Sequence, residues 1–185
     1  MAITQRRRTL HEFLKLPERK PALEFEGGVV VQKVWPKGKH GRLQSKLAEL
    51  IDRFAEPRKL AMAFTETRAT YANSSVVPDI AVYAWDRIPD REDEVANDFL
   101  VPPDIAVEVV SPKQSVMALV RKCQRFVERG SRLALLVDPE DRSVLLFQPG
   151  GRARALRGPD RINLDAVLPG FELTVQQLFD TLRVE

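Results

Sequence analysis

The chain has 185 residues, of which 44% are hydrophobic and 30% charged, as expected for one soluble globular domain with a substantial core. Its net charge of +3 permits an anionic partner without requiring one, and its single cysteine, Cys123, excludes an internal disulfide. No apolar run reaches the roughly 18 residues of a membrane helix, and the start lacks a signal-peptide core. We therefore expect a cytoplasmic protein with no membrane partner.

The first 21 residues are polar and basic, and we interpret them as an N-terminal extension to a domain over residues 22–185. Leu10, Phe13 and Leu14 predict a short helix that docks on this domain. From Leu23 to Trp35, two apolar runs flank a pair of glycines, which predicts a β-hairpin.

Residues 39–55 form the first clear helical pattern, with an apolar face made by leucines, an isoleucine and a phenylalanine at spacings of three and four. On a helical wheel, His40 lies near this face, Gln44 lies at its margin and Glu49 lies almost opposite. We therefore expect Glu49 to be solvated and His40 to be close to whatever the helix covers.

Three short strands are predicted next, at residues 60–67, 76–85 and 105–110, with residues 71–75 joining the first two. Residues 86–97 are dense in charge and proline and read as a surface loop. The third strand is closed by Ser111 and Pro112.

A second helix is expected over residues 115–130, ended by Gly130, and Lys122 lies at the edge of its apolar stripe. An edge position lets a lysine bury its aliphatic stem while its amine reaches along the sheet surface. Strands follow at 133–137 and 143–148, and Thr174 is a plausible cap for a final short helix.

This order of elements predicts an α/β fold built on a mixed β-sheet with a helix on each face and an N-terminal β-hairpin. The strand–helix–strand unit over residues 104–137 implies a parallel crossover, whereas the earlier strands have short links and should be antiparallel.

Two of the apolar strands carry a carboxylate: Asp79 opens one and Glu108 lies inside the next. An unpaired buried charge is costly, so each carboxylate needs a partner. A divalent cation such as Mg²⁺ prefers one or two carboxylates together with water and substrate oxygens. With a lysine at the same place, this set would suit metal-dependent cleavage of a phosphodiester bond.

The ordered set of motifs resembles the PD-(D/E)xK nuclease superfamily and, within it, the Uma family of restriction-endonuclease-like bacterial proteins. The resemblance spans roughly residues 22–180 and rests on Leu23-Glu24-Phe25 with Gly28, His40 at the start of a leucine-rich helix, Val77-Pro78-Asp79, Pro103-Asp104 to Glu108-Val109-Val110-Ser111-Pro112, and Lys122 with Phe126 and Gly130. It implies a restriction-endonuclease-like core and a DNA endonuclease that uses Mg²⁺ or Mn²⁺ bound by Asp79 and Glu108. It also implies a homodimer, because duplex cleavage needs two active sites.

The sequence departs from the superfamily pattern at Val110, where a lysine usually follows the second acid. The resemblance implies that Lys122, on the following helix, takes over this catalytic role. Glu24 and His40 are expected as auxiliary site residues. Asp104 and Ser111 more simply organise the ends of their strand.

Two other functions fit the same residues. The chain could be a catalytically silent module that binds nucleic acid or takes part in an assembly while keeping the nuclease fold. It could also be a glycosidase-like hydrolase with two carboxylates, although it lacks the aromatic residues that such enzymes use to bind sugars.

Overall fold

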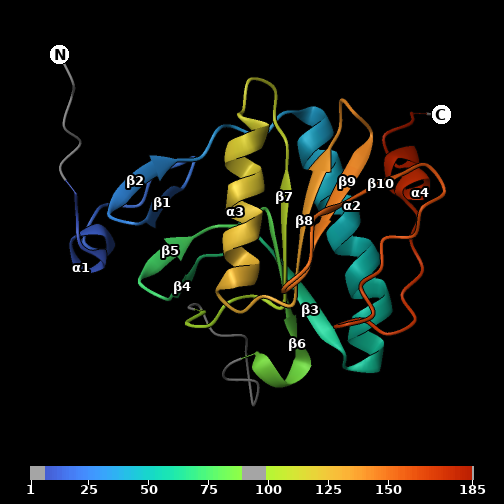
Figure 1. Cartoon of the computed structure of the whole chain (residues 1–185), viewed down its shortest axis with the longest axis horizontal. Helices are drawn as coiled ribbons and strands as arrows, with labels where there is room; N and C mark the ends of the chain where they lie inside the picture. The colour runs from blue at the N-terminus through green and yellow to red at the C-terminus, as the bar shows by residue number, and fades with distance from the viewer. Residues whose placement is uncertain (1–6, 89–98, 185) are drawn as a thin grey trace.

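The computed structural model describes residues 7–88 and 99–184 and is organised around a six-stranded mixed sheet (Figure 1). The strand order in this sheet is β10-β9-β8-β7-β6-β3. Its strands are β3 (Ala61–Thr65), β6 (Ile80–Ala84), β7 (Ile105–Val109), β8 (Leu133–Asp138), β9 (Ser143–Phe147) and β10 (Arg154–Arg157). The predicted mixed α/β fold is confirmed.

The only parallel pair among these described strands joins β7 to β8, in a register that runs from Ile105 opposite Leu133 to Val109 opposite Val137. Helix α3 (Val116–Glu128) makes the crossover between the two strands. It is capped by Ser115, whose side chain accepts a hydrogen bond from the amide of Ala118. The helix ends just before Gly130, whose φ of +112° favours glycine.

One long helix covers each face of the large sheet. Helix α2 (Gly38–Ala55) buries Leu43, Leu47 and Ile51 against one face, together with the C-terminal helix α4 (Val175–Asp180). Helix α3 buries Cys123 and Phe126 against the other face. Figure 1 shows α3 in front of the sheet and α2 behind it. As predicted, Thr174 caps α4, in a capping box with Gln177.

A second sheet of four antiparallel strands, in the order β2-β1-β5-β4, lies beside α3. Its strands are β1 (Leu23–Glu26), β2 (Val29–Gln32), β4 (Ala69–Tyr71) and β5 (Ser74–Val76). The predicted hairpin around Gly27 is therefore β1–β2, although the sequence did not predict that it belongs to a larger sheet.

The prediction of one strand over residues 76–85 is wrong, because the chain changes sheets at Val77-Pro78-Asp79. Pro78 has no amide hydrogen to donate to a strand ladder, so it suits this break between β5 and β6. Residues 71–75 are likewise more than a link. Ala72 and Asn73, both at positive φ, turn the chain from β4 into β5.

The N-terminal helix α1 (Leu10–Leu14) carries a capping box between Thr9 and Glu12. Its Phe13 is buried and stacks on Phe25 of β1, with ring centroids 5.4 Å apart. The division of the chain at residue 21 stays a prediction. Most of the loop predicted over residues 86–97 lies outside the described residues. No helix in the described part of the chain is both long and apolar enough to cross a membrane.

Candidate active site

Asp79 lies directly before β6, where the chain passes from the small sheet to the large one. Its side chain is almost completely buried, with 1% of the residue exposed. Oδ2 accepts a hydrogen bond of 2.7 Å from the backbone amide of Val109 in the neighbouring strand. The carboxylate is thereby fixed at the boundary between β6 and β7.

Glu108 occupies the same region from within β7 and is 2% exposed. Side chains alternate along a strand, so Val107 and Val109 face the core under α2 while Glu108 faces α3. Its Oε1 lies 2.8 Å from Nζ of Lys122. Val110 points to the same face and is buried there among apolar residues. The positively charged side chain beside Glu108 therefore comes from helix α3 and not from β7.

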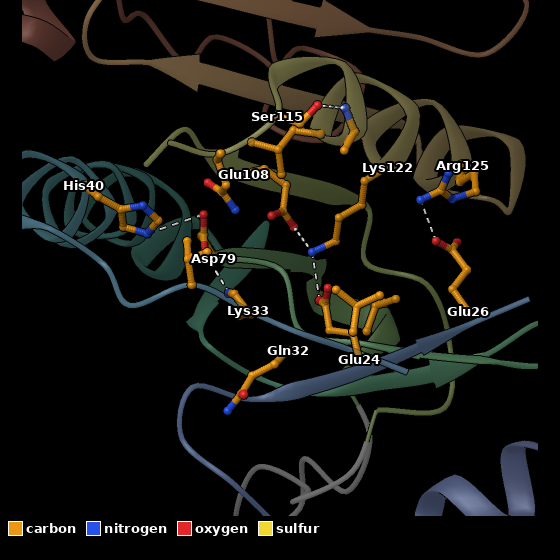
Figure 2. A pocket seen from close by; sticks show the side chains of 16 residues that line it. Glu24, Glu26, Gln32, Lys33, His40, Asp79, Glu108, Ser115, Lys122 and Arg125 are labelled. Atoms are coloured by element: carbon orange, nitrogen blue, oxygen red, sulfur yellow. Dashed lines mark hydrogen bonds and ion pairs between the residues drawn. The ribbon is translucent and has the colours of Figure 1, made fainter. Parts of the chain in front are cut away.

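Lys122 projects from α3 toward the sheet, and only 12% of its side chain is exposed. Its Nζ donates to Glu24 Oε1 at 2.8 Å and lies at the same distance from Glu108 Oε1 (Figure 2). The ammonium also lies 5.8 Å from the centre of the Phe126 ring. The structure thus brings the predicted lysine to the predicted acid.

Glu24 connects the N-terminal hairpin to this group. Besides meeting Lys122, its Oε1 accepts a hydrogen bond of 2.7 Å from the amide of Val77. The next acid along β1, Glu26, pairs at 2.5 Å with Arg125 of α3 and at 2.6 Å with Arg129, the residue that follows this helix. These contacts hold β1 against the helix that carries Lys122.

His40 is buried at the start of α2 with 5% of the residue exposed. Its Nδ1 is 2.9 Å from the hydroxyl oxygen of Ser111, the residue that follows Val110 at the end of β7. Its Nε2 is 3.4 Å from Oδ2 of Asp79. The structure therefore places His40 beside Asp79, and Ser111 orients its ring.

Lys33, which follows β2, is a site residue that the sequence reasoning missed. Its Nζ donates to Asp79 Oδ1 at 2.7 Å and to the backbone oxygen of Val77 at 3.0 Å, and it pairs with Glu66 at 3.0 Å. A lysine after an apolar hairpin strand carries no sequence signal for such a role, because its direction depends on how the hairpin docks. Gln44, predicted at the helix margin, donates to the backbone oxygen of Asp79 at 2.8 Å.

This group contains three carboxyl groups, those of Glu24, Asp79 and Glu108, and the ammonium groups of Lys33 and Lys122; Asp79 and Glu108 are buried, and Glu24 is partly buried. Burial would raise the pKa of Asp79, but its contact with His40 and the charge of Lys33 bring that pKa well below its ordinary value of 3.8. Burial raises the pKa of Glu108 to about 8, and the nearby charge of Asp79 adds to this rise, against the opposing charge of Lys122.

Lys122 shows the opposite balance of effects. Burial alone would lower its pKa, but the charges of Glu108 and Glu24 raise it above the ordinary value of 10.5. Burial would also lower the pKa of Lys33, but the charges of Asp79 and Glu108 outweigh this effect, so the pKa is raised overall. Both amines are therefore ammonium ions at neutral pH.

These side chains line a cavity of about 290 Å³ between the two sheets and α3 (Figure 2). Among its lining residues are Glu24, Lys33, His40, Asp79, Glu108 and Lys122. Asp104 is not among the lining residues. It is fully buried at the start of β7, where it accepts hydrogen bonds from the amide of Ala84 at 2.8 Å and from Arg87 at 2.6 Å. It organises the start of the strand, as expected.

A family model named Uma2, described as "Putative restriction endonuclease", matches residues 10–176. The chain belongs to the Uma2 family. A solved structure similar to this Uma2 chain is described as "a putative nuclease belonging to DUF820" from Anabaena variabilis. It is 36% identical, covers 95% of this chain and 99% of that one, and has a TM-score of 0.90. These matches confirm the resemblance noted from the sequence and the restriction-endonuclease-like fold.

A second solved structure is the cryoEM structure of a DrdV–DNA complex, with 14% identity, a TM-score of 0.40, and coverage of 74% of this chain and 11% of that chain. It is too dissimilar to inform either the fold or the function of this Uma2 protein. No curated protein matches the chain closely enough to count as a relative.

Proposed function

We propose that this Uma2 protein is a Mg²⁺-dependent endonuclease that hydrolyses phosphodiester bonds in DNA. The observation that carries the proposal is that Asp79, Glu108 and Lys122, from two adjacent strands and a covering helix, line one cavity. The description of the family model, "Putative restriction endonuclease", supports the same reaction class.

The residues present fit a divalent cation. Asp79 and Glu108 supply hard oxygen ligands of the kind that Mg²⁺ and Mn²⁺ prefer. Burial raises the pKa of Glu108 to about 8, and the charge of Asp79 adds to the rise. A dication bound there would favour the ionised form of Glu108 and compensate its charge. When bound, such an ion polarises the phosphate and lowers the pKa of a water molecule.

Lys122 acts in this reaction as a hydrogen-bond donor. Its pKa is raised, so at neutral pH it has no free electron pair with which to accept a proton from water. An ammonium held at a fixed position in this cavity stabilises the negative charge that develops on a phosphate oxygen. Glu24 positions the ammonium through its contact of 2.8 Å.

His40 and Glu24 are auxiliary residues in this proposal. His40 restrains Asp79, and Glu24 ties Lys122 to the backbone amide of Val77. We also propose that DNA is the polyanion that the protein binds, that a homodimer supplies two such sites to a duplex, and that the protein acts in the cytoplasm.

A silent module that keeps the nuclease fold is the second candidate. Two observations favour it: Val110 replaces the usual strand lysine, and each of the two proposed metal ligands already has an ammonium partner, Lys33 for Asp79 and Lys122 for Glu108. In that case the ion pairs would be structural and would stay closed in the presence of metal.

Nicking of supercoiled plasmid DNA in Mg²⁺ or Mn²⁺ distinguishes the two candidates. We expect the parent protein to nick, EDTA to stop the reaction, and Glu108→Gln to abolish it. The matched control is Glu140→Gln, which changes an exposed glutamate on the β8–β9 turn and should nick at the parent rate. Equal rates for Glu108→Gln and the parent protein would refute the proposed site. A parent protein that binds Mn²⁺ yet never nicks DNA or RNA would favour the silent module.

A further inference from the structure

The ammonium of Lys33 is surrounded by oxygen atoms in the way that a bound metal ion would be. Four oxygen atoms lie around its Nζ: Asp79 Oδ1 at 2.7 Å, the Val77 carbonyl oxygen at 3.0 Å, and the two Glu66 oxygens at 3.0 Å and 3.1 Å. An ammonium has only three protons to donate, so four acceptors exceed what one lysine can satisfy fully. Carboxylate and carbonyl oxygens gathered in this way also make a typical set of metal ligands.

His40 adds a nitrogen to the same place. Only 5% of the residue's surface is exposed, and its Nε2 makes no hydrogen bond within the described part of the chain. Its closest polar neighbour is Asp79 Oδ2 at 3.4 Å, and Figure 2 shows the ring directed at that carboxylate. To bind a metal, His40 must take the tautomer in which Nδ1 donates to Ser111 and Nε2 presents its lone pair.

These groups are close enough to share one ion. One ligand atom from each of His40, Glu66 and Asp79 can be chosen so that all three lie within 4.8 Å of one another. Ligands bound at about 2.1 Å lie at most about 4.2 Å apart, so no pair needs to close by more than about 0.6 Å. The 44% exposed side chain of Glu66 has the freedom to make that movement.

The cluster also faces a cavity that shares Lys33, Val34, His40 and Asp79 with the first. A second cavity, of about 690 Å³, is lined by Lys33, His40, Gln44, Glu66 and Asp79, and by residues 18–22 and 34–36. Glu24, Glu108 and Lys122 line the first cavity and not this one. Asp79 thus lines both cavities, with Glu108 in the first and Glu66 in the second.

We propose that His40, Glu66 and Asp79 form a second divalent-cation site, and that the ammonium of Lys33 holds its place when no metal is bound. The site is distinct from the one formed by Asp79 and Glu108, although the two share Asp79. One imidazole with two carboxylates suits Mn²⁺, Co²⁺ or Zn²⁺ better than Mg²⁺, which prefers oxygen ligands alone. The second site should therefore select a transition metal.

The Glu108→Gln variant isolates this site, because it removes a ligand of the proposed catalytic ion and none of the second. Binding is measured by calorimetric titration with Mn²⁺, and the ligands are identified by pulsed EPR, which detects a directly bound imidazole nitrogen. The only other histidine of the chain is His11, which is exposed on α1. A nitrogen coupling is thus assigned to His40 by its loss in Glu108→Gln/His40→Gln.

We expect Glu108→Gln to bind one Mn²⁺ with a nitrogen coupling, and the double variant to lose that coupling. Glu108→Gln/Glu66→Gln, which changes a part-exposed side chain and should fold normally, is expected to bind Mn²⁺ roughly tenfold more weakly. Loss of all Mn²⁺ binding in Glu108→Gln, or bound Mn²⁺ with no nitrogen coupling, would overturn the proposal. If Glu108→Gln retains as many Mn²⁺ ions as the parent protein, with the nitrogen coupling, the second site stands and the Asp79–Glu108 site fails.

Lys33→Met tests the placeholder role of Lys33. Removal of the competing charge should strengthen Mn²⁺ binding by roughly tenfold, equivalent to one pKa unit of charge interaction. The matched control is Lys46→Met, which removes a lysine that pairs with Glu49 on the outer side of α2. Equal Mn²⁺ affinities for Lys33→Met and Lys46→Met would refute the claim that Lys33 occupies the metal position.

Discussion

Replacement of Glu108 by glutamine should stabilise the metal-free protein, by an amount that grows with pH. Glu108 is 2% exposed and its pKa is raised from the ordinary value of 4.5 to about 8 by burial and by the charge of Asp79. Between those two values the unfolded chain has released the proton while the folded protein still holds it. The parent protein therefore loses stability as pH rises through this window, whereas the glutamine variant has no such group.

The size of the effect follows from this linkage. One bound proton changes the free energy of unfolding by about 1.4 kcal/mol per pH unit. From about pH 5 to about pH 8, the variant should gain on the order of 3 to 4 kcal/mol relative to the parent protein. This is a large fraction of the roughly 5–15 kcal/mol that stabilises a typical domain. Below about pH 4.5 both side chains are neutral, and the two proteins should differ by a constant amount.

Urea unfolding in EDTA, carried out at several pH values for both proteins, measures this difference. The matched control is Glu140→Gln, whose side chain is 70% exposed and whose effect should stay within about 0.5 kcal/mol at every pH. A stability difference between parent and Glu108→Gln that does not change with pH, or that favours the parent protein more as pH rises, would refute the reasoning. The charge of Lys122 would then fully compensate the ionised glutamate.

Three further outcomes are expected. Lys122→Met should lower the rate of plasmid nicking by about 10²–10³-fold without weakening Mn²⁺ binding, because the ammonium stabilises developing charge and does not hold the metal. An unchanged rate would show that Lys122 takes no part in the reaction. Asp104→Ala should lower the free energy of unfolding by about 3 kcal/mol, because it leaves the amide of Ala84 and the charge of Arg87 without their buried partner. The Mn²⁺ affinity of this variant should match that of the parent protein. Weaker Mn²⁺ binding would show that Asp104 belongs to the metal site. Thr174→Ala should cost about 1 kcal/mol in urea unfolding, since it removes the cap of α4; a loss of less than half that size would mean that packing alone fixes this helix.

The large sheet could be predicted because its strands and helices each carry a local pattern. The run from Ile105 to Val109 is apolar and bounded by prolines, and the stripe containing Cys123 and Phe126 has the spacing of one helical face. A strand, a helix and a second strand in this order leave little choice but a parallel crossover. Glu108 stood out as a carboxylate inside an otherwise apolar strand, and Asp79 as one at the entrance of an apolar strand.

The small sheet could not be predicted, because its assembly depends on contacts distant in sequence. Phe25 of β1 pairs with Ser75 of β5, some fifty residues further along the chain. Nothing local to either strand specifies this partner. The strand predicted over residues 76–85 includes Pro78, although the missing amide hydrogen of this proline is a physical reason for the chain to leave one sheet there and enter another.

The role of Lys33 was missed for the same reason. The side of the hairpin on which its side chain lies is fixed by the register of β1 with β2 and by the docking of β1 on β5. Glu66 is similar: it lies at a φ of +51° between β3 and β4, in a turn with no sequence signal for a charged pair with Lys33. Lys122 was found because an amphipathic helix fixes the direction of its side chains from sequence alone.

The most direct test of the proposed active site is a crystal soaked in Mn²⁺ and measured at the manganese absorption edge. The account predicts anomalous density in the cavity between Asp79 and Glu108, with Lys122 released from Glu108 and still bound to Glu24. A crystal in which this cavity holds no anomalous density, while Lys33 still binds Asp79 and Lys122 still binds Glu108, would contradict it.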